Sequence, residues 1–541
     1  MTMKPIKLAL LALALTLPHA AYAGDSEDFA GCDGLKKPKS KDDGMRGEAT
    51  VSRFGLNPFS SANTKAAQIV VACDKALSNP KLLPTQTVRR AHLLRARGAA
   101  KLQLKQHAAA LADFDAAQTT FGNAPDPFAQ RSMGVSLDLL RAIALYHLDR
   151  KDEAAALAAG AAQARPYAVQ VQMAAAVLER RGRAPGAVSG PAWANLMKLE
   201  PRARQNMVGD AIASGDFASA VKLAKDHPLS WPDMNLFAAP AAFEERITAI
   251  VGAYSQTMQL AYAHAATGDA AGARAHVDAA KAKLAGTGGT TLPPELTVLI
   301  ENKIVAPLAR QVEARLALAN GRVDDAAAIL ADPALVQTSA TAELAKAYRA
   351  QAPTGASVIP EPAAALPDTA ERDLSDLAEL LLIKPESMRS VIDYKKSRPA
   401  VLSAILGAGL SMGTSLLGGV PRTSGFRSAA NTDGTVKVEY TGGTTSGAMV
   451  QEMTLLRAAE LAREAGKSHF VIEARTDYQQ YLVMSQYGIE QSRTLSGYKT
   501  EMNVRFLDAA QAAPTAFDAV AVIDGLGPLY YDAPGAKDGR S

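Results

Sequence analysis

Apolar residues recur at helical spacing through more than half of the chain. From residue 62 to about residue 350 they return every three or four positions, which predicts a series of amphipathic helices. The clearest pair lies within residues 94–117 and turns at residues 104–106. Phe114 would pack there against small residues, which are Gly98, Ala99, Ala110 and Ala117. One such hairpin cannot bury its apolar face alone, so we expect stacked neighbours.

Similar hairpins follow, each with an alanine early in its second helix. These alanines are Ala110, Ala154, Ala220, Ala273 and Ala326. The pattern resembles the tetratricopeptide repeat family, most closely at residues 94–117 and 142–166 and more distantly at 261–280 and 314–330. The alanines lie 44, 66, 53 and 53 residues apart, whereas the family repeats about every 34 residues. We therefore expect longer helices or loops than the family has.

The resemblance to tetratricopeptide repeats also implies a concave face that binds protein segments. By analogy with the family, first-helix residues would point into this groove, namely His92, Tyr146, Tyr262 and Arg315. Half-buried aromatic side chains in such a groove would hold an extended or helical peptide. The alternative is that these four residues belong to the core.

The last 170 residues follow a different pattern. Prolines between Pro353 and Pro367 predict an extended linker over residues 351–370. Alternation at residues 436–441 and 501–506 predicts strands, and residues 455–466 predict a helix that leads to a buried strand at 470–472. We expect residues 371–541 to form a small α+β domain with a mixed sheet and a crossover helix. Arg457 and Glu460 would form a surface ion pair on that helix.

Residues 425–525 resemble a small domain of bacterial envelope proteins. The stretch Leu455-Leu456-Arg457-Ala458-Ala459-Glu460-Leu461-Ala462, followed by Gly466 and Phe470-Val471-Ile472, carries the likeness. Such domains are described as lipoprotein-like and of unknown function. The resemblance implies an envelope location and assigns no catalytic residue.

The first residues predict export from the cytoplasm. Two lysines, an apolar run and a small-residue site ending at Ala23 indicate a signal peptide over residues 1–23. Residues 24–61 would form an irregular cap. In an oxidising compartment such as the bacterial periplasm, Cys32 and Cys73 are expected to form a disulfide. The competing interpretation is that Cys32 ends a lipoprotein cleavage box and carries a lipid at a new N-terminus.

The candidates for chemistry are few. Residues 409–413 match G-x-S-x-G around Ser411, but the only downstream histidine, His469, begins a predicted strand. Residues 400–420 are uncharged and long enough to touch or cross a membrane. No spacing typical of a metal or cofactor site occurs, and a net charge of +4 gives no argument for nucleic acid. We expect no metal and no cofactor.

These observations favour a multidomain protein with an all-α, tetratricopeptide-like array at residues 62–350 and an α+β domain at its C-terminal end. We expect a non-enzymatic periplasmic scaffold or adaptor that binds a protein or peptide partner in the cell envelope. Association with the outer membrane is a further option for its location. The alternatives are a serine hydrolase that uses Ser411, and an envelope assembly component that docks on a membrane through residues 400–420.

Overall fold

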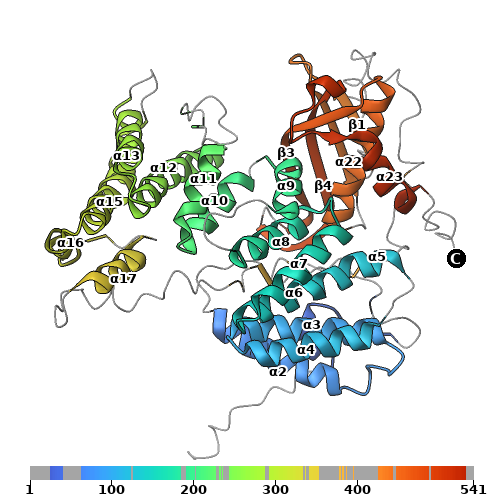
Figure 1. The fold of residues 1–541 in the computed structure, drawn as a ribbon. Coiled ribbons are helices and arrows are strands. Elements are labelled where there is room, and N and C mark those ends of the chain that lie inside the picture. The colour runs from blue at the N-terminus through green and yellow to red at the C-terminus, as the bar shows by residue number, and fades with distance from the viewer. Residues whose placement is uncertain are drawn as a thin grey trace, which may run out of the picture. The chain divides into compact units, whose positions relative to one another are not determined.

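A computed structural model of the chain describes most of the helices and the C-terminal sheet. It describes residues 25–39, 45, 62–122, 126–183, 190–352 with short gaps, isolated positions from 374 to 394, 425–442, 446–486 and 489–531. These residues belong to two compact units, residues 1–122 and 123–541. The chain is mostly helical and carries a small antiparallel sheet near its C-terminal end (Figure 1). The expected helical array and α+β domain are thus present in outline.

The first unit is a small helical cluster. Its helices are α1 (Asp25–Asp33), α2 (Ala62–Ser78), α3 (Thr87–Gln103) and α4 (His107–Phe121). Helices α3 and α4 are the hairpin predicted at residues 94–117. A Cβ atom added to Gly98 would lie 2.4 Å from Cε1 of Phe114, which confirms that this glycine admits the ring. Helix α1 occupies part of the segment that was expected to be irregular.

The second unit begins with a long run of helices. They are α5 (Pro127–Ala129), α6 (Val135–His147), α7 (Lys151–Ala164), α8 (Val169–Arg181), α9 (Pro191–Leu199), α10 (Ala203–Ala213), α11 (Phe217–Asp226), α12 (Phe243–Ala266), α13 (Ala270–Leu284), α14 (Pro294–Ile300), α15 (Ala306–Ala319), α16 (Val323–Leu330) and α17 (Thr341–Gln351). Two π-helical turns interrupt this run, η1 (Gln130–Gly134) before α6 and η3 (Glu301–Val305) before α15. Among the described helices, none combines the length and the apolar composition that a membrane span requires.

Five helix hairpins, formed by α3/α4, α6/α7, α10/α11, α12/α13 and α15/α16, turn with the same backbone geometry. One residue at each corner has φ between 58° and 83°; these residues are Lys105, Asp149, Gly215, Gly268 and Gly321. In each case the next N–H donates to a carbonyl five residues earlier, as at Asp269 to His264 (2.9 Å), which closes a Schellman-type cap. The alanine five residues after each corner residue is at most 2 % exposed. The prediction of repeated hairpins aligned on these alanines is confirmed.

The C-terminal sheet contains five strands and two helices. Its elements are β1 (Gly425–Ala430), β2 (Val436–Gly442), α22 (Gly447–Glu464), β3 (His469–Gln486), β4 (Ile489–Leu507), β5 (Phe517–Asp518) and α23 (Ala519–Tyr530). The strand order is β1-β2-β4-β3-β5, and every hydrogen-bonded pair is antiparallel. The mixed sheet was therefore a wrong prediction. Helix α22 does connect β2 to β3, but β4 returns between them and separates the two strands that were expected to be neighbours.

Candidate functional site

A buried cluster of charges joins the first helices of the second unit to its sheet domain. Arg165 follows α7 directly, and its Nε donates to Oε1 of Glu452 at 3.0 Å. Nη2 of the same guanidinium lies 3.0 to 3.1 Å from the carboxylate oxygens of Glu386. Arg131 approaches Glu452 at 2.7 Å, and the hydroxyl of Tyr530 donates to Glu452 at 2.6 Å. Residues from η1, α7, α22, α23 and the segment before the sheet thus meet at one point.

Local backbone features place these side chains. Ser446 is the N-cap of α22, where its hydroxyl accepts from the N–H of Met449 at 3.2 Å and donates to Glu386. The backbone N–H of Glu386 donates to the hydroxyl of Ser132 at 2.8 Å, and Ser132 lies in the π-helical turn η1. Such turns are rare in proteins as a whole, but they occur frequently at functional sites. Here the turn places both Arg131 and Ser132 against the sheet domain.

The carboxylates of this cluster are shielded from water, and the neighbouring charges shift their pKa values. The side chains of Arg165, Glu386 and Glu452 are at most 2 % exposed. Burial alone would raise the pKa of Glu452, but Arg131 and Arg165 outweigh it and lower that pKa to about 2. Burial raises the pKa of Glu386, and the neighbouring Glu452 adds to this rise against the attraction of Arg165. The arrangement is suited to fixing one structural element on another, since solvent does not reach its carboxylates.

A second polar contact in the same unit ties helix α9 to the sheet. Nη1 of Arg475, on β3, donates to the carbonyl of Leu199 at the end of α9 (3.3 Å). Its Nε donates to Asp477 at 2.9 Å, and Asp477 also accepts from Thr500 at 2.6 Å and from Gln451 at 3.2 Å. Because Arg475 is 4 % exposed, this contact is also protected from water. The sheet domain is therefore fixed to the helices at more than one place.

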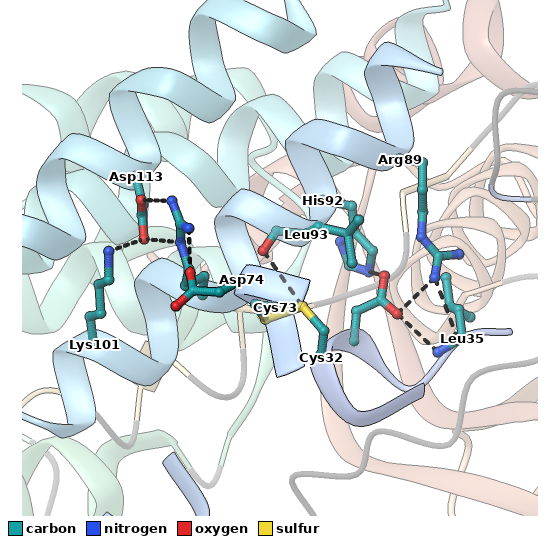
Figure 2. The surroundings of a disulfide bond; sticks show 11 residues. Cys32, Leu35, Cys73, Asp74, Arg89, His92, Leu93, Lys101 and Asp113 are labelled. Atoms are coloured by element: carbon teal, nitrogen blue, oxygen red, sulfur yellow. Dashed lines mark hydrogen bonds and ion pairs between the residues drawn. A yellow bond between two sulfur atoms is a disulfide. The ribbon is translucent and has the colours of Figure 1, made fainter. Parts of the chain in front are cut away.

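The first unit holds its own buried polar group, next to the disulfide (Figure 2). Asp33 accepts from Nη2 of Arg89 at 2.9 Å, and its other oxygen lies 3.8 Å from Nε2 of His92. Nη2 of Arg95 lies 2.8 Å from Nδ1 of His92. Burial raises the pKa of Asp33 to about 6 against the opposing effect of Arg89, and burial lowers the pKa of Arg95 to about 9.

The disulfide predicted between Cys32 and Cys73 is present. The two sulfur atoms are 2.04 Å apart, and the bond connects α1 to α2 beside the group around Asp33. A sulfur bonded to Cys73 has no valence left for a thioether, so this bond is incompatible with lipid attachment at Cys32. Nearby, Arg97 of α3 binds both Asp113 and Asp74, at 2.6 Å each, and thereby links α2, α3 and α4.

The four residues predicted to line a groove lie in different surroundings. His92 is 5 % exposed and belongs to the buried group of the first unit. Tyr262 is fully buried, and its hydroxyl donates to Glu343 of α17, which also accepts from Nε of Arg315 at 3.2 Å. Tyr146 is partly exposed on α6, with its ring 5.5 Å from that of His147. Only Tyr262 and Arg315 are thus brought together, through a shared contact with the half-buried Glu343.

The prediction that Arg457 and Glu460 form an ion pair on the surface was wrong, because the pair is buried. Both side chains are 7 % exposed, with 2.9 Å between Nη1 of Arg457 and Oε2 of Glu460. Helix α23 packs over this side of α22, and the hydroxyl of Tyr531 donates to Glu460 at 2.9 Å. The pair was expected on the surface because Arg457 and Glu460 lie on one side of the helix, and the local pattern does not reveal that α23, more than fifty residues further along the chain, covers this side.

The remaining candidate residues either lie outside the described residues or do not form a catalytic or metal-binding group within them. Ser411, the uncharged segment 400–420 and the signal peptide at residues 1–23 all lie outside the described residues. His469 begins β3, and its Nδ1 lies 2.9 Å from the hydroxyl of Ser468. Within the described ranges no three or more His, Cys, Asp or Glu side chains are placed to hold a metal.

The sequence analysis missed the buried ion cluster. One signal for it was available: Glu452 is the only charged residue between Gly447 and Leu456 in a largely apolar stretch of the helix, and a lone charge there requires a partner. Its partners lie 287 and 321 residues away in the chain, so no local pattern points to them. The chain matches no protein-family model, no curated protein and no solved structure.

Proposed function

We propose that this chain is a non-enzymatic scaffold or adaptor of the bacterial periplasm that binds a protein partner through its helical hairpins. The tetratricopeptide-like pattern and the expected signal peptide motivate this proposal. The observation that carries it is the buried cluster around Arg165. A dry ion cluster of this kind holds the sheet domain and the first helices of the second unit in one arrangement, as a scaffold requires.

The cluster also determines which form of the protein to test. A fragment that ends near residue 350 lacks Glu386 and Glu452, and Arg131 and Arg165 would lose their buried partners. We therefore choose the mature chain, residues 24–541, immobilised and exposed to a periplasmic extract. We expect a discrete partner to be retained after a wash at high salt, and to be absent when the same chain is unfolded before immobilisation. Retention of nothing beyond this control would overturn the proposal.

Two rival functions have their own tests. A hydrolase built on Ser411 would react with a fluorophosphonate probe, and the Ser411→Ala variant would lose that labelling; this result would replace the adaptor by an enzyme. A membrane-docking role for residues 400–420 would keep the mature chain with membranes after carbonate extraction, whereas we expect it in the supernatant.

A further inference from the structure

Two histidine side chains meet across the hairpin of α12 and α13 (Figure 1). His264 lies in the last turn of α12 and His276 lies on α13, and their ring centroids are 5.1 Å apart. Two imidazoles bound to one tetrahedral zinc ion, with metal–nitrogen distances of about 2.0 Å, have ring centroids about 5 Å apart. The separation of the two rings therefore matches that of a pair of zinc ligands.

Asp269 fixes the orientation of His264. Its Oδ2 lies 2.8 Å from Nδ1 of His264, and its Oδ1 accepts from the N–H of Gly272 at 2.9 Å as the N-cap of α13. Because an ionised carboxylate only accepts hydrogen bonds, neutral His264 carries its proton on Nδ1 and has its lone pair on Nε2. A carboxylate that holds a ligand histidine in this way is a recurrent feature of metal sites.

Gly272 leaves the space that this arrangement occupies. A Cβ atom added there would lie 2.4 Å from Oδ2 of Asp269 and 2.4 Å from Nδ1 of His264. Any larger residue would displace the imidazole or its carboxylate partner. The first turn of α13 thus accommodates the side chain of His264 beside the helix cap.

Solvent reaches the two histidines, and the neutral form of His276 is favoured. The side chain of His264 is 14 % exposed, that of Asp269 is 49 % exposed, and His276 is half-buried. Burial lowers the pKa of His276 and the charge of His264 lowers it further, against the effect of Asp269. Since metal ions bind the neutral imidazole, a zinc ion would not have to displace a proton from this ring near pH 7.

We propose that His264 and His276 bind one Zn²⁺ ion, with Asp269 orienting His264 and water at the remaining coordination positions. Imidazole nitrogen is a preferred ligand of zinc. The described residues place no third His, Cys, Asp or Glu with this pair as a ligand, so we expect an exchangeable ion and not a structural one. The proposal goes beyond the adaptor function and does not depend on it.

The expectation that the chain binds no metal came from short spacings in the sequence. His264 and His276 are twelve positions apart and match no compact metal-binding motif. Only the turn between α12 and α13 brings their rings together. A site of this kind is therefore visible in the fold and not in the local pattern.

Isothermal titration calorimetry of zinc chloride into the mature chain, residues 24–541, tests the site. We expect one ion per chain with a dissociation constant in the micromolar range. His264→Gln and His276→Gln should each weaken binding about tenfold or more, because each removes one of two ligands. His107→Gln is the matched control and should leave the affinity unchanged, since this half-buried histidine begins α4 in the other unit.

Two further variants separate the metal site from an effect on folding. Asp269→Asn keeps the helix cap, because asparagine caps helices as well as aspartate does, but it should lower the zinc affinity about tenfold by weakening the hold on His264. Gly272→Ala should also lower the affinity, whereas Gly160→Ala should not, because a Cβ at Gly160 meets nothing within 4 Å. Circular dichroism verifies that each variant is folded.

Thermal unfolding gives an independent readout. Zinc should raise the Tm of the unmodified chain and leave that of His276→Gln unchanged, because an ion that binds only the folded state stabilises it. Binding of zinc by His264→Gln or by His276→Gln as tightly as by the unmodified chain would overturn the proposal and place the ion elsewhere. Failure of the unmodified chain to bind zinc at submillimolar concentration would overturn it as well.

Discussion

Glu386 and Glu452 bind the same guanidinium, that of Arg165, yet their pKa values move in opposite directions. Glu452 has the additional partners Arg131 and Tyr530, and its pKa falls to about 2. The pKa of Glu386 rises because burial and the charge of Glu452 outweigh Arg165. The two carboxylates are therefore not equivalent, and Glu452 is the more acidic of the two.

Replacing these two glutamates in turn tests this difference. Glu452→Gln should lower the free energy of unfolding at pH 7 by about 3 kcal/mol, because it leaves the buried Arg165 and the half-buried Arg131 without their main counter-charge. Glu386→Gln should cost less, since burial and the charge of Glu452 oppose the ionised form of Glu386. Urea denaturation of both variants checks this, and equal losses in the two would contradict the assignment.

The loss of folding stability at acidic pH should depend on Glu452. A folded-state pKa of about 2, below the ordinary 4.5, gives stability that is complete above about pH 4.5 and is lost as the pH falls toward 2. In Glu452→Gln this loss should be missing, so the variant and the unmodified chain should converge in acid. Unfolding measured by circular dichroism from pH 6 down to about 2.5 provides the comparison. A constant difference across that range would show that the charge of Glu452 is not responsible.

Asp33 should give the opposite pH dependence in the first unit. Its folded-state pKa of about 6 exceeds the ordinary 3.8, so between these values the folded chain keeps a proton that the unfolded chain releases. Stability therefore falls as the pH rises through this window, by about 3 kcal/mol in full. Asp33→Asn should remove this fall. Hydrogen exchange of α1 to α3 at pH 4 and pH 7 measures it, with the Asp33→Asn variant under the same two conditions as the control.

The sequence predicted the features that depend on residues close together in the chain. Small residues facing Phe114, and the alanines that follow each corner, are short-range features, and the hairpins they predict are present. The strand order was not predictable in the same way, because β4 pairs with β2 across more than fifty residues. The buried cluster is an extreme case: neither Arg165 nor Glu386 lies in a distinctive local pattern, and only the fold brings them together.

Close packing at Gly98 predicts a cost for any larger side chain. Gly98→Ala should destabilise the first unit by about 2 kcal/mol, because the new Cβ would overlap the ring of Phe114. Combining it with Phe114→Leu should recover part of this loss in a double-mutant cycle. Gly160→Ala is the matched control, since Gly160 also lies inside a helix but a Cβ there meets nothing within 4 Å. This control should be neutral or stabilise by about 0.5 to 1 kcal/mol.

The hairpin corners predict opposite effects for glycine at two equivalent positions. Asp149 adopts φ 59° and Gly321 adopts φ 72°, in the left-handed region that side chains other than glycine enter at a cost of about 1 to 2 kcal/mol. Asp149→Gly should therefore stabilise the α6/α7 hairpin by about 1 kcal/mol, and Gly321→Ala should destabilise the α15/α16 hairpin by a similar amount. A Cβ at Gly321 meets no atom within 4 Å, so the loss reports backbone strain alone. Thermal unfolding of both variants measures the effect, and a Gly321→Ala variant as stable as the unmodified chain would show that the corner does not need this conformation.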